Sequence, residues 1–527
     1  MRNFLRNILE PFSKSFFLMF LSKFLGFTIP LGRFFSPRFQ FFSGFHNCIR
    51  RIFQNLFRTD RYSEKHSRLA SRYSRLDPLS RFYEIDEALR PLIDDNIIGF
   101  PPTISVEPLA PLNITMGSKF LPIHSDSDFS HYFSIRKLAK HPDWEETHFF
   151  FDKRYEYDAK EFSETLQKRL GYFGIKPEWV EHPFATELVL GREAFFRDFT
   201  DFIIDSSEKL STKSLVIWCS PFHNEDSYNT IKRELTVHKD ISTQQVRRDN
   251  IAAAIQKDLL GSGYINPLIP QLVAKMGGFP YLFQKGITAS NTIFVGLDRF
   301  RDPEKKLPSV TAAAASFSNH GEYLGAASAT LDADQTDNFQ DLDKVMKDLL
   351  STITKERTDF SKVVVLRDGT RLDLSGEIRA VFGVLDEFSL QGVFVTANKS
   401  SRIRIFEGDP EEEDIAENPD QYLAITDFYD SHRFVVASSQ PIITKSGTPL
   451  GTAQPVLYTI EERTNPEPLE ILKADLARGI AAFTRLNWAS FKGNKLPAPI
   501  TFAHDLAGLC GKLGTSWSSR LRRPTYI

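Results

Sequence analysis

Four polar residues between positions 228 and 275 have side chains of the kinds that bind a phosphate group. Tyr228 and Lys232 are four residues apart, so on a helix their phenol and ammonium groups share one face. Gln244 adds an amide, and Lys275, in a Lys-x-Gly-Gly sequence, adds a second ammonium. A phosphate monoester has up to two charges and three acceptor oxygens, so it needs several converging donors. These four residues, the quartet, predict a phosphate pocket in which the tyrosine ring can stack on a base.

Each member of the quartet also has an ordinary interpretation. A Tyr–Lys pair at helical spacing is usually a surface pair, and a lysine before two glycines often marks the end of a helix. Gln245 takes the place of Gln244 if the pattern is shifted by one residue. The prediction of a phosphate pocket therefore depends on all four side chains meeting in space.

A second set of residues, Asp298, Asp368 and His504, has the chemistry of a metal site. Each aspartate follows an apolar run typical of a strand, so we expect each strand to end there. Hydrolysis of a phosphodiester by two metal ions uses carboxylates, sometimes with an imidazole, to hold Mg²⁺ ions ~4 Å apart. The three residues predict a Mg²⁺ or Mn²⁺ site. The ordinary alternative is that each aspartate is a turn residue or a helix cap.

The elements around the quartet indicate an α/β domain over residues 146–285. Apolar runs typical of buried strands alternate with segments of helical periodicity, which implies a parallel sheet covered on both faces. Ser227 is the expected N-cap of the helix that carries Tyr228 and Lys232. The expected strands are 148–151 and 214–219, and the expected helices are 159–170 and 227–235.

Residues 286–527 show a second α/β pattern around the metal-binding candidates. The acidic segment 407–417 is interpreted as a solvated loop. The chain shows no internal repeats. The expected strands are 292–297, 309–316, 323–330, 362–366 and 392–396, and the expected helices are 342–353 and a segment starting at 377.

The first 145 residues form two further segments. Residues 1–60 are basic and rich in phenylalanine, with Lys23 inside their most apolar run, so we expect no stable membrane insertion. They fit a signal peptide, a membrane-surface segment, a disordered extension, or translated sequence upstream of the true start. Residues 61–145 are a helical and linker region, with a helix expected before 100 and short strands and loops between five prolines after it.

Bulk composition limits the possible classes only weakly. The chain of 527 residues has a net charge of −2, so binding of nucleic acid requires a local basic patch. Its three cysteines, Cys48, Cys219 and Cys510, match neither a disulfide framework nor the spacing of zinc ligands. A reducing compartment is therefore expected, and we predict a cytoplasmic protein.

The motifs together resemble those of the Argonaute family. The quartet follows the order of the 5′-phosphate-binding residues of the MID domain. Three segments resemble the motifs of the PIWI domain: Ile293–Asp298, Val364–Gly369, and Leu486–Trp488 with Leu496–His504. The resemblance implies a Rossmann-like MID domain (146–285) followed by an RNase H-like PIWI domain (286–527), with the quartet holding the 5′ phosphate of a short guide.

Two further family features bear on binding of the 5′ phosphate. In prokaryotic members a divalent ion, often held by the C-terminal carboxylate, helps to bind the phosphate; here that residue is Ile527. The family often has a further lysine one turn before the last one, and Gln271 stands there instead.

Slicing members carry a glutamate about thirty residues before the second aspartate. The acids in that place are Asp332, Asp334 and Asp337, of which Asp337 fits best, whereas Glu322 lies too early. An aspartate side chain is one methylene shorter than that of a glutamate. A catalytic group displaced by ~1 Å lowers the rate on the order of 10²-fold.

Length points to the short prokaryotic Argonautes within this family. Residues 61–145 are too few for an N-terminal domain and a PAZ domain at ~100 residues each. The resemblance then implies a protein that binds a guide RNA or DNA and senses complementary target strands. Its implied partner is an APAZ-containing effector (TIR, Sir2-like or nuclease) in defence against plasmids or phages. The alternatives are a metal-dependent endonuclease guided in the same way and an interaction module without nucleic acid. First-base preference is expected to come from residues 221–227.

Overall fold

The computed structural model divides into two compact units. The larger unit comprises residues 104–400, 418–440 and 454–527, and the smaller comprises 1–103, 401–417 and 441–453. The predictions for residues 1–100, Cys48, Asp332, Asp334 and Asp337 lie outside the described residues. The described residues are 107–108, 112–123, 128, 131, 133, 137–185, 192–288, 291–301, 310–331, 340–369, 374–401, 403, 406–409, 414–417, 423–425, 432–438, 442–443, 449–450, 455–488, 493–517 and 523–527.

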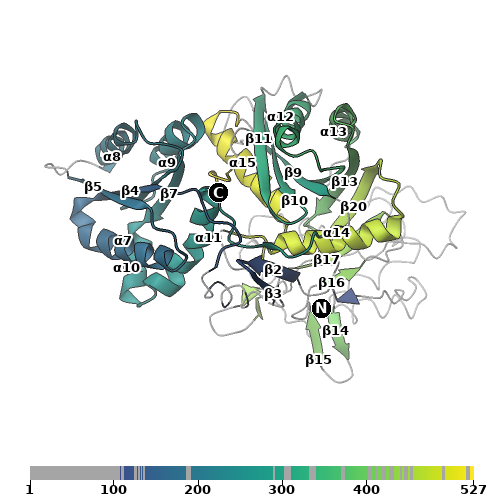
Figure 1. Cartoon of the computed structure of the whole chain (residues 1–527), viewed down its shortest axis with the longest axis horizontal. Coiled ribbons are helices and arrows are strands. Elements are labelled where there is room, and N and C mark those ends of the chain that lie inside the picture. The colour runs from purple at the N-terminus through teal and green to yellow at the C-terminus, as the bar shows by residue number, and fades with distance from the viewer. Residues whose placement is uncertain are drawn as a thin grey trace, which may run out of the picture. The chain divides into compact units, whose positions relative to one another are not determined.

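The quartet lies in a region built on a four-stranded parallel sheet, as predicted (Figure 1). Alternate side chains of its strands enter different cores: Phe149 and Phe151 pack in one and Phe150 in the other. This alternation is the period-two pattern of a strand buried on both faces. The strands, in spatial order, are β5 (Glu178–Phe184), β4 (Glu146–Asp152), β6 (Ser214–Ser220) and β7 (Ser242–Arg247).

Helices cover both faces of this sheet, which confirms the expected layering. One core contains buried side chains of α7 (Glu156–Gly171), α10 (Arg248–Gln256) and α11 (Asn266–Lys275). The other contains those of α8 (Arg192–Ser206), α9 (Glu225–Ile231) and the π-helical segment η2 (Lys232–His238). A second π-helical segment, η3 (Leu260–Ile265), precedes α11.

The expected N-cap of α9 was wrong. The helix begins at Glu225, and Asn224 is its N-cap, with an extended backbone and a side-chain oxygen that accepts from the Ser227 amide at 2.8 Å. Ser227 instead accepts a hydrogen bond from the Thr200 hydroxyl at 2.9 Å. An asparagine followed by two acids satisfies the first amides better than a serine three residues later.

The second region is built on a mixed sheet of nine strands within the described residues. Strands β9, β12 and β13 are parallel, and the remaining pairs are antiparallel. The five strands predicted here are all present. In spatial order the strands are β1 (Glu107–Pro108), β16 (Leu423–Ile425), β17 (Arg433–Ala437), β20 (Val456–Arg463), β13 (Gln391–Asn398), β12 (Lys362–Asp368), β9 (Thr292–Arg301), β10 (Val310–Ser318) and β11 (Tyr323–Leu331).

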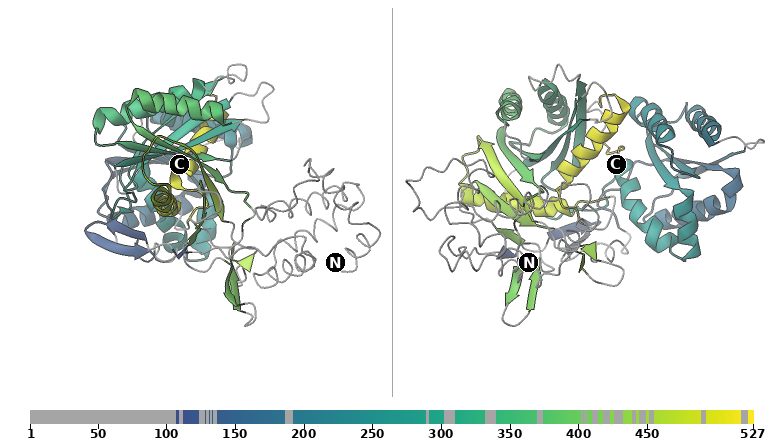
Figure 2. Two further views of the ribbon diagram at one scale, coloured as in Figure 1. Left: turned by 90° about the vertical axis from the view of Figure 1, so that its right-hand side faces the viewer. Right: turned by 180° about the vertical axis from the view of Figure 1, so that it is seen from behind.

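Helices lie on both faces of the nine-stranded sheet (Figures 1 and 2). Helix α15 (Ala498–Leu513) packs on β9 and β10 from one side, and α12 (Gln340–Glu356) packs on β10 and β11 from the other. Helix α13 (Ser375–Glu387) joins α12, and α14 (Leu469–Thr484) packs against β17. The predicted helices at 342–353 and from 377 are therefore confirmed.

Two expectations about element ends were wrong. Strand β9 does not end at Asp298 but continues to Arg301, because β10 pairs with it along that whole length. Part of the acidic segment 407–417 is strand and not loop: β14 (Phe406–Asp409) and β15 (Asp414–Glu417) pair antiparallel in the smaller unit, and residues 410–413 lie outside the described residues. Apolar residues and a glycine interrupt its acids, and pairing satisfies the backbone groups.

A small antiparallel sheet joins the segment before the first region to the segment after it. Its strands are β3 (Lys119–Ile123), β2 (Leu112–Met116) and β8 (Leu282–Phe283), and Lys140 bridges to Phe279. The short strands expected between the prolines of 101–145 are thus present. The short strands β18 (Ile442–Ile443) and β19 (Pro449–Leu450) pair in the smaller unit. Among the described residues, no helix has the length and apolar character needed to cross a membrane.

Candidate functional site

The two lysines of the quartet converge on one carbonyl oxygen. Lys232 begins η2, Lys275 ends α11, and their Nζ atoms lie 3.4 Å and 2.9 Å from the backbone oxygen of Thr243 on β7. Lys275 Nζ also donates to Oε1 of Gln244 at 2.8 Å. The ring of Tyr228 on α9 lies 5.8 Å from Lys232 Nζ. Elements distant in sequence therefore bring the four predicted side chains together, and Gln244 rather than Gln245 contacts a lysine.

The turn after α11 sets the position of Lys275. Gly277 has φ of 77°, a left-handed conformation that ends the helix. A Cβ on Gly278 would lie 2.8 Å from the backbone nitrogen of Pro142. The two glycines thus mark a helix end, as the ordinary interpretation held, and the same end points Lys275 into the pocket.

Both lysines are buried without an acidic partner. Lys232 is 1% exposed and Lys275 is 2% exposed. Among the described residues, no carboxylate lies within ion-pair distance of either. Burial lowers the pKa of Lys232 to about 7. Burial, and then the charge of Lys232, lower the pKa of Lys275 well below its ordinary value. The pocket therefore has donors and positive charge but lacks an anion.

The C-terminal residues complete this pocket. The backbone oxygen of Thr525 accepts from Lys232 Nζ at 3.2 Å, and Thr525 and Tyr526 are buried. Arg523 fastens the segment by donating to the Asp240 backbone oxygen at 2.9 Å, and Tyr526 contacts the Tyr323 hydroxyl at 3.3 Å. No local sequence pattern reveals such a backbone carbonyl. Ile527, the predicted metal ligand, ends the segment that reaches the pocket, and its metal role stays a prediction.

The second candidate set is partly assembled. His504 Nδ1 lies 2.7 Å from Oδ2 of Asp298. Gly296 permits this contact, because a Cβ there would lie 2.0 Å from the Pro499 backbone at the start of α15. Leu297 on β9 is in register with Arg367 on β12, so Asp298 and Asp368 occupy the next positions of neighbouring strands. The fold therefore places the two aspartates side by side at one edge of the parallel pair.

Ionisation of this pair reflects its contacts. Burial alone would raise the pKa of Asp298, but the hydrogen bond with His504, a backbone amide and the charge of Arg367 lower it. The hydrogen bond to Asp298 raises the pKa of His504 against an opposing effect of burial. The contact therefore favours the carboxylate form of Asp298 and the protonated form of His504.

Cations already contact both aspartates. Lys399 Nζ lies 2.5 Å from Oδ2 of Asp368, and Arg367 Nη1 lies 3.6 Å from Oδ1 of Asp298. Within the described part of the chain, no three His, Cys, Asp or Glu side chains are grouped to hold a metal ion. Oδ1 of Asp368 is nevertheless buried without a hydrogen-bond partner there. The donor types suit Mg²⁺, but a metal would have to compete with Lys399.

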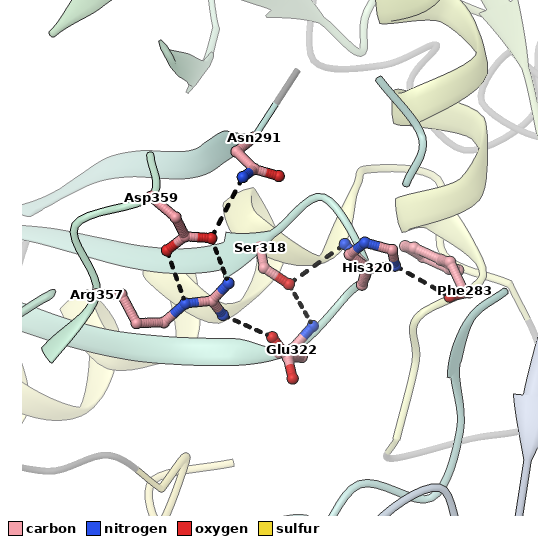
Figure 3. A network of polar contacts seen from close by, with 7 residues as sticks. All are labelled: Phe283, Asn291, Ser318, His320, Glu322, Arg357 and Asp359. Atoms are coloured by element: carbon pink, nitrogen blue, oxygen red, sulfur yellow. Dashed lines mark hydrogen bonds and ion pairs between the residues drawn. The ribbon is translucent and has the colours of Figure 1, made fainter. Parts of the chain in front are cut away.

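Glu322 lies in a separate polar network with Arg357 and Asp359 (Figure 3). It follows the turn between β10 and β11, where Arg357 binds it at 2.8 Å. The turn that carries Glu322 begins at Ser318, which pairs with Ile293 on β9. Asp298 lies five residues further along β9, a distance on the order of 17 Å at ~3.3 Å per residue. Glu322 therefore cannot supply a fourth acid beside Asp298, and the candidate Asp337 lies outside the described residues.

A buried chain of alternating charges runs behind the cluster, and the sequence motifs did not reveal it. Arg299 contacts Asp341 at 2.9 Å and Glu377 at 3.5 Å. Glu377 also accepts from Arg367 at 3.1 Å, and Arg367 approaches Asp298. Asp341 and Glu377 have no exposed side-chain surface. These ion pairs connect the first turns of α12 and α13 to Asp298, at the predicted metal-binding site.

The family follows from the sequence and the fold. The model of the Piwi domain family matches residues 215–514, more than half of the chain, so the protein belongs to the Piwi domain family. The second region accordingly has the RNase H-like fold of that domain. No curated protein matches the sequence.

Solved structures of similar fold agree with this assignment. Drosophila Piwi matches with a TM-score of 0.66 and 16% identity, over 88% of this chain and 63% of that one. The C-terminal lobe of a budding yeast Argonaute matches with a TM-score of 0.63 and 12% identity, over 80% and 95%. Kluyveromyces polysporus Argonaute, solved with a guide RNA, matches with a TM-score of 0.64 and 12% identity, over 88% and 58%. The chain thus spans less than two thirds of the Drosophila and Kluyveromyces chains.

Proposed function

We propose that this protein binds a short guide RNA or DNA by its 5′ phosphate and uses the guide to recognise a complementary strand. The observation that carries this proposal is the pair of buried lysine side chains, Lys232 and Lys275, which lack an acidic partner among the described residues. A terminal phosphate supplies up to two negative charges and three acceptor oxygens to such a pocket.

The other two members of the quartet lie beside the lysines. Gln244 accepts from Lys275 through its amide oxygen and donates to the Gln245 backbone oxygen through its amide nitrogen, and the ring of Tyr228 is placed to stack on the terminal base. These contacts are to the phosphate and to a ring face, so they suit RNA and DNA equally. The loop between β6 and α9 offers Phe222, which is 44% exposed with the Arg192 guanidinium 5.0 Å from its ring. We assign first-base preference to this loop.

A binding assay tests the main proposal. Purified protein is titrated with one guide sequence carrying either a 5′ phosphate or a 5′ hydroxyl. We expect the phosphate to tighten binding, and the double variant Lys232→Ala/Lys275→Ala to lose at least about 10²-fold of affinity for the phosphorylated guide. Lys257→Ala, at an exposed position after α10, is the matched control and should bind normally. Equal affinity for both guides, or full binding by the double variant, would refute the proposal.

Guide-directed cleavage is the second candidate function, favoured by the adjacent aspartates and the unpartnered Oδ1 of Asp368. Asp298, Asp368 and His504 would hold Mg²⁺ or Mn²⁺, which would supply an activated water for hydrolysis of a phosphodiester. Incubation of guide-loaded protein with a labelled complementary strand and either metal tests it. Cleavage opposite the middle of the guide that is lost in Asp298→Ala is expected for a nuclease, and absence of product excludes it.

We further propose a division into a MID domain (146–285) and a PIWI domain (286–527), and an APAZ-containing effector as partner in defence against plasmids or phages. The two separate sheets support the division. Identification of proteins and nucleic acids that co-purify with the chain from its native cells tests the partner. Recovery of the chain alone, with guide bound, would contradict it.

A further inference from the structure

The two lysines of the quartet face each other across one acceptor. Lys232 Nζ and Lys275 Nζ both contact the backbone oxygen of Thr243, at 3.4 Å and 2.9 Å. Their other acceptors are neutral: the Thr525 backbone oxygen for Lys232 and the Gln244 amide oxygen for Lys275. Two ammonium ions thus share a pocket whose direct acceptors carry no net charge.

Such an arrangement disfavours the doubly charged state of the empty pocket. A buried ammonium loses hydration that neutral acceptors replace only in part, and a second one nearby adds repulsion. Burial lowers the pKa of Lys232 to about 7, and the pKa of Lys275 is lowered further by its neighbour's charge. At least one of the two amines is therefore neutral near pH 8 while the pocket is empty.

The other ionisable groups around the pocket do not supply the missing charge. Tyr228 on α9 and Tyr526 on the C-terminal segment are phenols whose pKa values are raised, chiefly by burial and also by the charge of Asp505 on α15. Arg523 is paired with Asp240 at 3.3 Å. Asp505 forms no ion pair with either lysine among the described residues. No described side chain balances both lysines, so an incoming anion would supply the missing charge.

We propose that capture of a terminal phosphate by this pocket is coupled to the uptake of protons from solvent at Lys275 and Lys232. This inference rests on the proposed function and describes how that site is regulated. A proton adds to the neutral amine nitrogen as the phosphate enters, so the bound state contains two ammonium groups beside a dianion. No other bond changes, and the buffer supplies the proton.

The sign of the pH dependence follows directly. The lysines have lower proton affinity in the empty pocket than in the occupied one, so binding weakens as pH rises from about 7. Each proton taken up contributes up to about tenfold in dissociation constant per pH unit. Below about pH 6 the phosphate itself gains a proton, which removes charge from the ligand. Affinity is therefore greatest between about pH 6 and 7.

Calorimetry measures the coupling. The wild-type protein is titrated at pH 8 with a 5′-phosphorylated guide in Tris and in HEPES, whose protonation enthalpies differ. We expect the uptake of about one to two protons per guide, and a dissociation constant that rises about tenfold per pH unit for each proton between pH 7.5 and 8.5. The 5′-hydroxyl guide controls for other titrating groups and should show neither effect.

Variants identify the groups that take up the protons. Lys275→Met removes one ammonium group while keeping a similar volume, so Lys232 no longer faces a like charge. We expect weaker but detectable binding, at least a halving of proton uptake, and a higher melting temperature of the guide-free protein, because folding no longer buries an amine whose pKa is lowered. The wild-type titration is decisive even if this variant does not fold.

The outcomes separate this inference from the proposed function. Phosphate-dependent binding with no proton uptake and a flat pH profile overturns the coupling but leaves guide binding intact. Equal binding of phosphorylated and hydroxyl guides overturns both. Uptake that is unchanged in Lys275→Met, with normal affinity, would place the protonation elsewhere and overturn the assignment to the lysines.

Discussion

The two candidate sites of this protein differ in whether their ionisable side chains already contact groups of opposite charge. The quartet has two buried lysine amines and no acidic partner among the described residues, so it lacks an anion. At the edge formed by β9 and β12, both aspartates already contact cations, and a chain of alternating charges continues behind them. A site that lacks a counter-charge favours a ligand that brings one, whereas a neutralised site makes a ligand compete with its own residues.

The largest expected effect comes from giving the pocket its own anion. Lys275→Glu would place a carboxylate beside Lys232 and make the quartet neutral, like the aspartate cluster. We expect a loss of about 10³-fold in affinity for a 5′-phosphorylated guide, since an attraction becomes a repulsion. Fluorescence anisotropy with a labelled guide measures it. Lys275→Met should lose less, and equal losses in the two variants would show that the pocket does not discriminate by charge.

The next effect concerns the buried charge chain. Glu377→Gln removes the acid that contacts both Arg299 and Arg367, leaving two guanidinium groups with less compensation. We expect the free energy of unfolding to fall by about 3–5 kcal/mol, measured by urea denaturation. Glu387→Gln is a matched control, because its ion pair with Lys347 is exposed, and it should change stability by less than about 1 kcal/mol. Similar stabilities of the two variants would mean that the buried ion pairs of Glu377 contribute little to the free energy of unfolding.

A smaller effect is expected at the aspartates. Lys399→Gln removes the cation that contacts Asp368. The side chain of Lys399 is 48% exposed. We expect binding of Mn²⁺, followed by electron paramagnetic resonance, to tighten by about three- to tenfold, because an exposed ion pair competes only weakly. Lys347→Gln, on a different surface, should leave Mn²⁺ binding unchanged. No gain in Lys399→Gln would show that this lysine does not limit metal binding.

The smallest effect is the pH dependence of the Asp298–His504 pair. The pKa of Asp298 is lowered, so its contribution to stability is lost as pH falls through that value; the pKa of His504 is raised, so its contribution is lost as pH rises through it. Asp298→Asn should therefore destabilise most near pH 5–6 and least above pH 8. The difference should not exceed about 1 kcal/mol, because His504 is 61% exposed. Urea denaturation at both pH values measures it, and a pH-independent cost would contradict the assigned ion pair.

The sequence by itself determined the elements and the candidate residues. Apolar runs such as 214–219 and 362–366 fixed strands because a strand buried on both faces needs an uninterrupted apolar sequence. The order of the quartet identified four residues that the fold then brought together. Local competition between similar residues was harder to judge: Asn224 rather than Ser227 caps α9, and pairing with β10 carries β9 past Asp298.

Only the tertiary structure decided the electrostatic state of each site. Whether Lys232 is charged depends on its burial, on the nearness of Lys275 and on the Thr525 carbonyl, and these depend on α9, α11 and the C-terminal segment meeting in space. The pairing of Lys399 with Asp368 and the distance of Glu322 from Asp298 likewise depend on strand register. Spacing along the chain encodes periodicity, but burial and charge pairing arise between distant residues, so no local pattern contains them.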